Sequence, residues 1–452
     1  MERKRRRSSH VTQPTTNEKK SADVQAGDEA SISCLPLEIL EHIFSFLLRN
    51  DRLQAMSVCS TWKSLILKSS RLWRSQTYVF NCTLPITPKK KADLLFCVQH
   101  FGPHMQTLSI KCRHPCLYIC QKMAHRFSLF LNGLNAQAIT SFKVSNLGLG
   151  FTRTPALKNI SNTLAQMFAR QRLKVFEMPK AYWPEVDGHT VLDTVFQTSR
   201  NNLETLNINE YFFDRTLVHI DQDWFSSSLT SLTKLTKLSI DLSYLTDELI
   251  ISLARARRGE LAYLSLWVKL HFSYTAPVIH DSWIYLTKAC PDMEVEFKIE
   301  SWSSKPSELI PAILDSTLPV RRLKLQISHS FGALPTPAYQ MEIVLDHVTK
   351  YYGERLESFK LKFNIKEFID QSLLMLVRDC PRLVQVKITA AYRSSRTART
   401  VDKIVTERRQ SHLNNKTPPN KKVCTDRNSV DNTSPLEDPM EGPSGLKGAS
   451  QQ

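Results

Sequence analysis

The segments LETLNI (residues 203–208), LTKLSI (235–240) and LAYLSL (261–266) repeat one arrangement of apolar residues, L-x-x-L-x-L. The alternation at the end of this pattern indicates a β-strand with one buried face. Helix-like stretches separate several such segments, for example residues 246–256, 281–289 and 371–378. A strand and a helix that recur along a chain are typical of a solenoid, in which each unit buries its apolar side against the next.

Related segments extend this pattern over most of the chain. Between residues 206 and 386 their central positions lie 26 to 36 residues apart, whereas leucine-rich repeats usually span about 20–29 residues. Proline ends two of the intervening helices, at Cys290-Pro291 and Cys380-Pro381, and favours an extended segment after them. We therefore expect an irregular α/β leucine-rich-repeat solenoid. Its predicted strands are Met105–Cys112, Ile139–Val144, Leu173–Met178, Leu203–Ile208, Leu235–Ile240, Leu261–Leu266, Met293–Ile299, Val320–Leu325, Leu356–Leu361 and Leu383–Ile388.

Strand–helix alternation is also typical of a doubly wound sheet that binds nucleotides. Gly148-Leu149-Gly150 is the only G-x-G in the chain, and no Gly-Lys-Ser/Thr follows it. The sequence also lacks G-x-S-x-G and H-E-x-x-H, so none of these catalytic motifs is present. We therefore favour the solenoid, expect no catalytic residues and no cofactor, and expect any catalysis to come from partners.

The helix predicted after Leu35-Pro36 is apolar around most of its circumference. Proline suits the first position of a helix, and Glu38, Glu41, His42 and Ser45 occupy a single sector of it. The apolar residues cover about 200°, while a helix on one core shows a stripe of roughly 100°. Because fewer than 50 residues form only a marginal core, the helix needs a second apolar neighbour. That neighbour is the following domain or another protein; burial by its own module alone is the alternative.

This region resembles the F-box family. The motif residues are Leu35 to Leu40, Ile43 to Leu47, Asp51, Leu53, Val58, Cys59, Trp62, Leu72 and Trp73. The resemblance implies a three-helix F-box that binds a Skp-type adaptor and, through it, a cullin scaffold of a ubiquitin ligase. It also implies the adaptor contacts Leu35, Pro36, Ile39, Leu40, Ile43 and Phe44, with Val58, Cys59, Trp62, Leu72 and Trp73 shared between contact and internal packing.

A looser resemblance, to the F-box-only proteins numbered thirty-three and thirty-nine, covers most of residues 34–392. Residues 206–212, 238–240 and 246–249 carry it. It implies that the repeat region binds the target protein. The expected fold is α+β: a small three-helix F-box, an irregular leucine-rich-repeat solenoid and disordered termini. The predicted divisions are residues 1–33 (disordered basic tail), 34–80 (F-box), 84–392 (solenoid) and 393–452 (disordered tail).

The target surface is predicted from strand geometry. Residues between the apolar positions of a strand point away from the helices, and at these positions aromatic and acidic residues give way to a row of basic ones. Basic side chains suit an acidic or phosphorylated segment, and Trp267 would be an apolar anchor; an ordinary solvated face is the alternative. The predicted target-binding residues are Tyr263, Trp267, Arg322, Lys324, Lys360, Lys362 and Lys387.

The net charge of +17 leaves a second class of protein open. Two basic runs lie in the solvated tails: Arg3 to Arg7, and Arg408, Arg409, Lys421 and Lys422 near the C-terminus. The run Arg3 to Arg7 fits either a nuclear-import signal or a solubilising tail. A nuclear scaffold or nucleic-acid-binding protein is therefore the competing interpretation, although no nucleic-acid-binding motif supports it. No apolar run approaches the about 18 residues of a membrane span, and no signal peptide precedes the fold. We expect a protein of the cytoplasm or nucleus without membrane contact.

Cys112, Cys116 and Cys120, near His114 and His125, form the one cluster that could suggest zinc. Zinc sites usually have two short, well-separated cysteine pairs, and here three residues separate successive cysteines. Since unpaired cysteine is among the most buried residue types, we interpret these thiols as packing residues and expect no metal. The ten scattered cysteines fit a reducing compartment.

Overall fold

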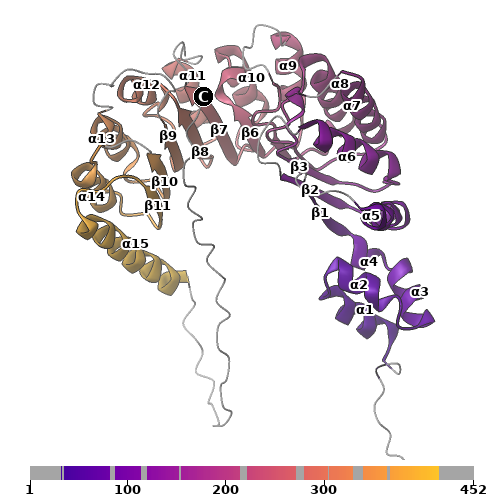
Figure 1. Cartoon of the computed structure of the whole chain (residues 1–452). Coiled ribbons are helices and arrows are strands. Elements are labelled where there is room, and N and C mark those ends of the chain that lie inside the picture. Colours follow the sequence, from indigo (N-terminus) through magenta and orange to yellow (C-terminus); the bar gives the residue numbers. More distant parts are fainter. Residues whose placement is uncertain are drawn as a thin grey trace, which may run out of the picture.

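The computed structural model shows an arch with a small helical module at one end and a curved parallel sheet along its inner side (Figure 1). Helices cover the outer side of the sheet. Most of the predicted disordered tails, residues 1–31 and 417–452, lie outside the described residues. The structure describes residue 32 and residues 35–81, 87–113, 120–151, 154–213, 221–270, 279–303, 305–328, 340–363 and 367–416.

The N-terminal module consists of short helices whose starts follow from local chemistry. Pro36 is the N-cap residue of the first helix. The Cys59 thiol accepts a hydrogen bond from the Trp62 amide (3.5 Å), and the Ser69 hydroxyl accepts one from the Leu72 amide (3.1 Å). These caps satisfy amides that have no partner within the helix. The helices are α1 (Leu37–Ser45), α2 (Arg49–Ala55), α3 (Ser60–Lys68) and the single turn α4 (Ser70–Trp73).

Within the described residues the sheet has eleven strands, all parallel, and their spatial order is their order in the chain. This topology is that of a solenoid, and it excludes the doubly wound alternative, whose strand order reverses. All ten predicted strands are confirmed. The strands are β1 (Ser75–Asn81), β2 (Thr107–Arg113), β3 (Ser141–Ser145), β4 (Val175–Glu177), β5 (Thr205–Asn207), β6 (Lys237–Asp241), β7 (Tyr263–Leu270), β8 (Glu294–Ser301), β9 (Val320–Ile327), β10 (Ser358–Phe363) and β11 (Gln385–Thr389).

The leucines of the L-x-x-L-x-L pattern form the core between the sheet and the outer helices. In the unit around β6, Leu235, Leu238 and Ile240 are all fully buried. The three helices predicted between strands are present as α10, α11 and α14, and Cys290 and Cys380 end the last two as predicted. The outer helices are α5 (Pro88–Phe101), α6 (Cys120–Gly133), α7 (Thr154–Phe168), α8 (Glu185–Ser199), α9 (Gln222–Thr230), α10 (Asp247–Ala256), α11 (His280–Ala289), α12 (Pro306–Ile313), α13 (Met341–Tyr352) and α14 (Asp370–Asp379).

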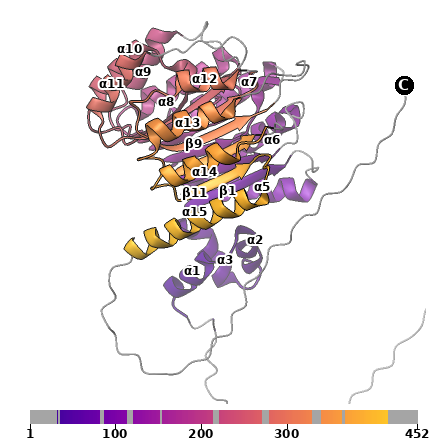
Figure 2. The ribbon, with the colours of Figure 1, turned by 90° about the vertical axis from the view of Figure 1, so that its left-hand side faces the viewer.

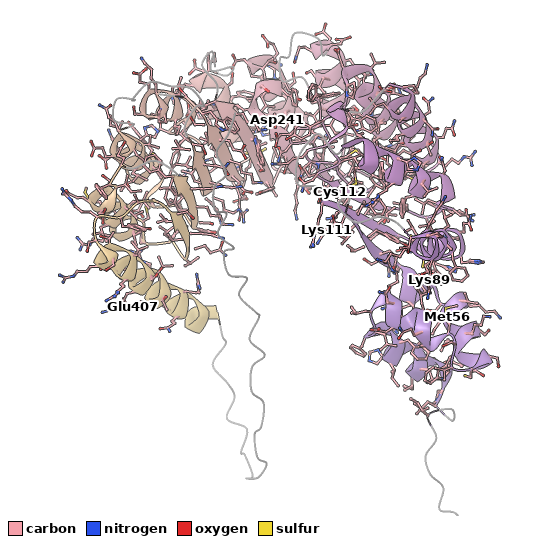
Figure 3. The ribbon with its side chains drawn as sticks, in the orientation of Figure 1. Met56, Lys89, Lys111, Cys112, Asp241 and Glu407 are labelled. Atoms are coloured by element: carbon pink, nitrogen blue, oxygen red, sulfur yellow. The ribbon has the colours of Figure 1, made fainter. Side chains whose placement is uncertain are left out.

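The other strand residues face the inner side of the arch. In β9 the sequence alternates between buried leucines and partly exposed residues such as Arg322 and Lys324. In β2 the exposed Lys111 precedes the buried Cys112, and Figure 3 shows Lys111 at the inner side of the arch. Because the side chains of a strand alternate between its two faces, the inner face of the arch is lined by polar and charged residues.

The predicted F-box, residues 34–80, includes almost all of the first strand of the sheet. Strand β1 was assigned to the helical module, but it pairs with β2 along its whole length and begins the sheet. Trp73 at the end of α4 stacks on Phe101 of α5, with ring centroids 3.5 Å apart. The carbonyl of Arg74 accepts hydrogen bonds from the amides of residues 106 and 107 (2.8 and 2.9 Å). The helical module is therefore joined to the solenoid by continuous packing, without a linker.

The prediction of disorder from residue 393 onward is wrong for its first part, where α15 spans Ser395–Lys416. Figure 2 shows α15 along the C-terminal end of the arch, where it packs on α14 and β11. Val401 and Val405 are buried, and the guanidinium of Arg408 donates to the carbonyls of Val377 (2.6 Å) and Cys380 (2.8 Å). Arg408 therefore satisfies the free carbonyls at the end of α14, and α15 covers the last unit of the solenoid.

In the part of the chain that the structure describes, no helix is both long enough and apolar enough to cross a membrane.

Candidate protein-interaction surfaces

One face of α1 presents apolar side chains to solvent. Ile39, Ile43 and Phe46 follow one another at helical spacing and are 47%, 36% and 76% exposed. We call these three residues the apolar stripe. A module this small seldom exposes a row of large apolar residues unless another molecule covers it. On this side the described chain supplies no apolar neighbour, so a second neighbour for α1 would have to be another molecule.

The opposite side of α1, which carries two of the predicted adaptor contacts, is buried by its own module. Leu40 and Phe44 are 1% and 2% exposed, and Phe44 packs edge-on against Trp62 at 5.0 Å. Arg52 holds this arrangement in place, because its guanidinium donates to the carbonyls of Phe44 and Ser45 (both 2.9 Å) and of Leu72. Leu40 and Phe44 therefore belong to the core of the module.

The remaining residues predicted for adaptor contact fall into two groups. Pro36, Val58 and Cys59 are exposed, and Leu35 and Trp62 are half-buried, so all five can be reached. Leu72 and Trp73 are buried, and the indole of Trp73 donates to the Ile66 carbonyl (2.7 Å). Of the two roles predicted for Leu72 and Trp73, the structure therefore shows internal packing.

A hollow lies between the start of α1 and α3, away from the apolar stripe. It has a volume of about 560 Å³ and is lined by Leu37, Ser60, Thr61, Ser64, Leu65 and Lys68. Leu37, at the start of α1, is 50% exposed there. The module therefore carries an exposed apolar stripe and, on another side of α1, a recess with one charged side chain.

The inner face of the solenoid brings four lysines into one row. Lys298, Lys324, Lys360 and Lys387 are direct neighbours across β8, β9, β10 and β11. We call these four residues the lysine row. Neighbouring strands lie about 4.8 Å apart, so the row is roughly 15 Å long. The predicted residue Lys362 lies two positions beyond Lys360 on β10 and is also exposed. The basic part of the predicted target surface is thus brought together by the fold.

The aromatic part of that prediction is wrong for Trp267, which is only 9% exposed. The ammonium group of Lys180 lies 4.5 Å from the centre of its ring, and those of Lys324 and Lys269 lie 5.8 and 6.0 Å away. Cations over an indole ring are attracted to its π face. Trp267 therefore supports the surrounding lysines from below, and it is not the exposed apolar anchor that strand alternation suggested.

Tyr263 and Arg322 are also held by neighbours. The Arg322 guanidinium pairs with Glu294 (2.6 Å) and lies 5.0 Å from the ring centre of Tyr263. The Tyr263 hydroxyl donates to Glu296, and burial together with this bond raises the pKa of Tyr263 to about 12. Both side chains are only partly exposed. Tyr263 and Arg322 are thus bonded to glutamates of β8, next to the β8 end of the lysine row.

A buried ionic cluster beside Trp267 was not predicted. Glu210 follows β5 in a left-handed conformation (φ 53°) and is 1% exposed. It pairs with Lys180 (3.3 Å) and Lys269 and accepts a hydrogen bond from the Tyr182 hydroxyl (2.7 Å), while its amide donates to Asp241 (3.0 Å). Burial lowers the pKa of Lys269 to about 8, with Lys180 acting in the same direction and Glu300 against it. The sequence carries a weak signal: Lys180 and Glu210 each stand two residues after an apolar repeat motif.

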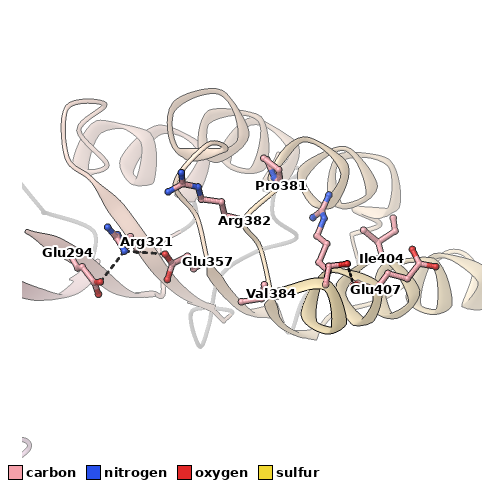
Figure 4. A pocket seen from close by; sticks show the side chains of 10 residues that line it. Glu294, Arg321, Glu357, Pro381, Arg382, Val384, Ile404 and Glu407 are labelled. Atoms are coloured by element: carbon pink, nitrogen blue, oxygen red, sulfur yellow. Dashed lines mark hydrogen bonds and ion pairs between the residues drawn. The ribbon is translucent and has the colours of Figure 1, made fainter. Parts of the chain in front are cut away.

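A groove of about 820 Å³ lies between the starts of the last strands and α15 (Figure 4). Arg321 in its wall pairs with Glu294 (3.0 Å) and Glu357 (3.2 Å), and Arg408 binds the end of α14. Arg321 thus links neighbouring strands and Arg408 attaches α15 to α14, so we assign the groove a structural role.

The cysteine cluster is only partly described. Cys112 is buried in β2, Cys116 lies outside the described residues, and the side chain of Cys120 is not described. Within the described ranges no group of three His, Cys, Asp or Glu side chains is placed to hold a metal ion.

The fold is thus a small helical module with an exposed apolar stripe, fused to a solenoid of strand–helix units. A family model described as F-box-like matches residues 32–78, which comprise the helical module and the first part of β1. These residues therefore form an F-box-like domain. Domains of this kind generally bind Skp-type adaptors and usually belong to non-catalytic subunits.

Proposed function

We propose that this protein is the substrate-recognition subunit of a ubiquitin ligase of the Skp–cullin–F-box type. Its F-box-like domain would bind the Skp-type adaptor, the adaptor would connect it to the cullin, and the inner face of the solenoid, which we assign to the leucine-rich-repeat class, would bind the target. The protein itself would perform no chemistry. It would raise the local concentration of the target near the transferring enzyme.

The observation that carries the proposal is the apolar stripe on α1. Phe46 is 76% exposed and Ile39 is 47% exposed, while Leu40 and Phe44 on the same helix are buried. Burying an exposed side chain of this size in an interface contributes about 1.5–3 kcal/mol. The stripe and the reachable residues Pro36, Val58 and Cys59 are therefore the adaptor contacts that the geometry supports, in place of Leu40, Phe44, Leu72 and Trp73.

The test is capture of a purified Skp-type adaptor by the full-length chain. The variant Ile39→Asp/Phe46→Ala removes two of the exposed side chains and leaves the buried side of α1 intact. We expect its affinity for the adaptor to fall by about 100-fold, since two central apolar contacts cost about 1–2 kcal/mol each. Isothermal titration calorimetry measures the loss.

The matched control is Val186→Asp in α8, which places the same charge at an apolar residue that is 78% exposed in the solenoid. This control should bind the adaptor like the wild type. An unaltered adaptor affinity in the Ile39→Asp/Phe46→Ala variant, or a wild-type chain that does not capture the adaptor, would refute the proposed function.

A further inference from the structure

The lysine row concentrates positive charge that the described chain does not neutralise. Lys298 has a partner, because it lies 3.3 Å from Glu296 and donates to Ser265 (3.1 Å). Among the described residues, no carboxylate comes within 4.0 Å of the ammonium groups of Lys324, Lys360 or Lys387. Like charges on directly opposite strand positions destabilise a sheet. The lysine row is therefore an unfavourable arrangement of like charges on the inner face of the sheet.

The electrostatics of Lys324 agree with this geometry. Burial lowers its pKa, and Lys180, Lys298 and Lys360 lower it further, while Glu300 alone acts in the opposite direction. Lys324 thus lies where charges from β8, β10 and the loop after β4 meet. An anion that reached this point would interact with several cations at once, and such charge-assisted bonds are among the stronger ones in proteins.

From the length and the borders of the row we propose that it binds a short acidic peptide segment of the target protein. A row of roughly 15 Å matches four to five residues of extended chain at about 3.3 Å each. Its β8 border carries Glu296 and Glu300, one on each side of Lys298 along the strand, and Glu300 would repel a polyanion that continued past the row. The inference rests on the proposed function, because it names the chemical class of the target.

A nucleic-acid strand fits this surface less well. Binding of single strands usually combines a basic groove with exposed aromatic rings on which bases stack. Trp267, the aromatic residue at the end of the row, is buried beneath Lys180, Lys269 and Lys324. The carboxylates at the β8 border would also oppose a continuing phosphate backbone. We therefore argue for the peptide and make the nucleic acid an outcome of the test.

The probe is a fluorescein-labelled peptide of six glutamates, and its anisotropy is titrated with the full-length chain at low salt. The test variant is Lys324→Glu/Lys360→Glu. The control, Lys288→Glu/Lys350→Glu, makes the same change in net charge at exposed positions of α11 and α13 on the helical side. We expect about a tenfold or greater loss of affinity for the test variant and less than a twofold change for the control.

Two further measurements keep the result decisive. The milder variant Lys360→Gln/Lys387→Gln alters exposed positions only, should unfold at the wild-type temperature and should lose affinity about threefold. All row variants should capture the Skp-type adaptor normally, so a failure of adaptor binding in the wild type would refute the proposed function without deciding about the row.

Three outcomes overturn the inference. The first is wild-type affinity of the glutamate peptide for Lys324→Glu/Lys360→Glu. The second is an equal loss in the helical-side control, which would mean that overall charge alone attracts the peptide. The third is a six-nucleotide oligothymidylate that binds through the row more tightly than the peptide, which would assign the surface to nucleic acid.

Discussion

The helical module and the inner face of the solenoid differ in what they leave exposed. The module exposes the apolar side chains Ile39, Ile43 and Phe46, whereas the inner face between β8 and β11 exposes lysines over a buried tryptophan. An apolar surface suits a partner that stays bound, since its energy comes from area removed from water. A charged surface mainly provides fast association and selectivity. The two ends of the arch are thus suited to one durable partner and one exchangeable partner.

The largest effect is expected at the junction between the helical module and the solenoid. Trp73→Ala removes a fully buried ring that stacks on Phe101 and holds the two regions together. We expect it to lower the free energy of unfolding by about 3–5 kcal/mol, because large cavities in a core are costly. Chemical denaturation measures this loss. The control is Phe46→Ala, which should leave stability unchanged and weaken adaptor binding; equal stability of the two variants would contradict the assignment of Trp73 to the core.

The next largest effect is expected at the ionic cluster that supports the lysine row. Glu210→Gln removes the carboxylate between Lys180 and Lys269 while keeping the size of the side chain. Hydrogen bonds to charged groups contribute about 1.5–3 kcal/mol each, so we expect a loss of about 2–3 kcal/mol by thermal unfolding. Adaptor binding should be unaffected. Wild-type stability in this variant would show that the cluster does not stabilise the inner face.

The smallest effect is expected from salt concentration. It distinguishes the apolar stripe from the lysine row most directly. Raising sodium chloride from 50 to 200 mM should weaken binding of the glutamate peptide about tenfold, because exposed charges are screened over the Debye length. Adaptor binding through the apolar stripe should change by less than about twofold. Parallel titrations of both partners measure the two responses. Similar salt dependence for both would remove the distinction between the two surfaces.

Much of this fold can be predicted from the sequence, because each strand carries its own apolar pattern. All ten predicted strands are present, and the helices after residues 246, 280 and 370 lie where proline and the apolar spacing indicated. Strand β1 was missed because SQTYVFN adjoins the helical motif and has no leucine pattern. Helix α15 was missed because it buries few apolar residues and is held largely by Arg408 and Arg409, which bond to backbone carbonyls.

The binding surfaces were predictable only where burial follows the local pattern. The lysine row follows directly from strand alternation. Trp267 does not, because Lys180, which follows β4 and is far from it in the sequence, covers it together with Lys269 of its own strand. The division of α1 into a buried side with Leu40 and an exposed side with Ile39 depends on where α3 and α4 pack. Both details are set by tertiary contacts, which a pattern along one segment does not contain.

The stacked pair Trp73 and Phe101 has a consequence for how a captured target would be modified. A junction built from packed rings and backbone hydrogen bonds joins the solenoid tightly to the F-box-like domain, and would hold it at a fixed angle to a bound adaptor. A target seated on β8 to β11 would then be held at a constant distance and orientation from the ubiquitin donor. Which of its lysines receives ubiquitin would accordingly depend on the distance and direction of each lysine from the ubiquitin donor, which the length and curvature of the arch would set.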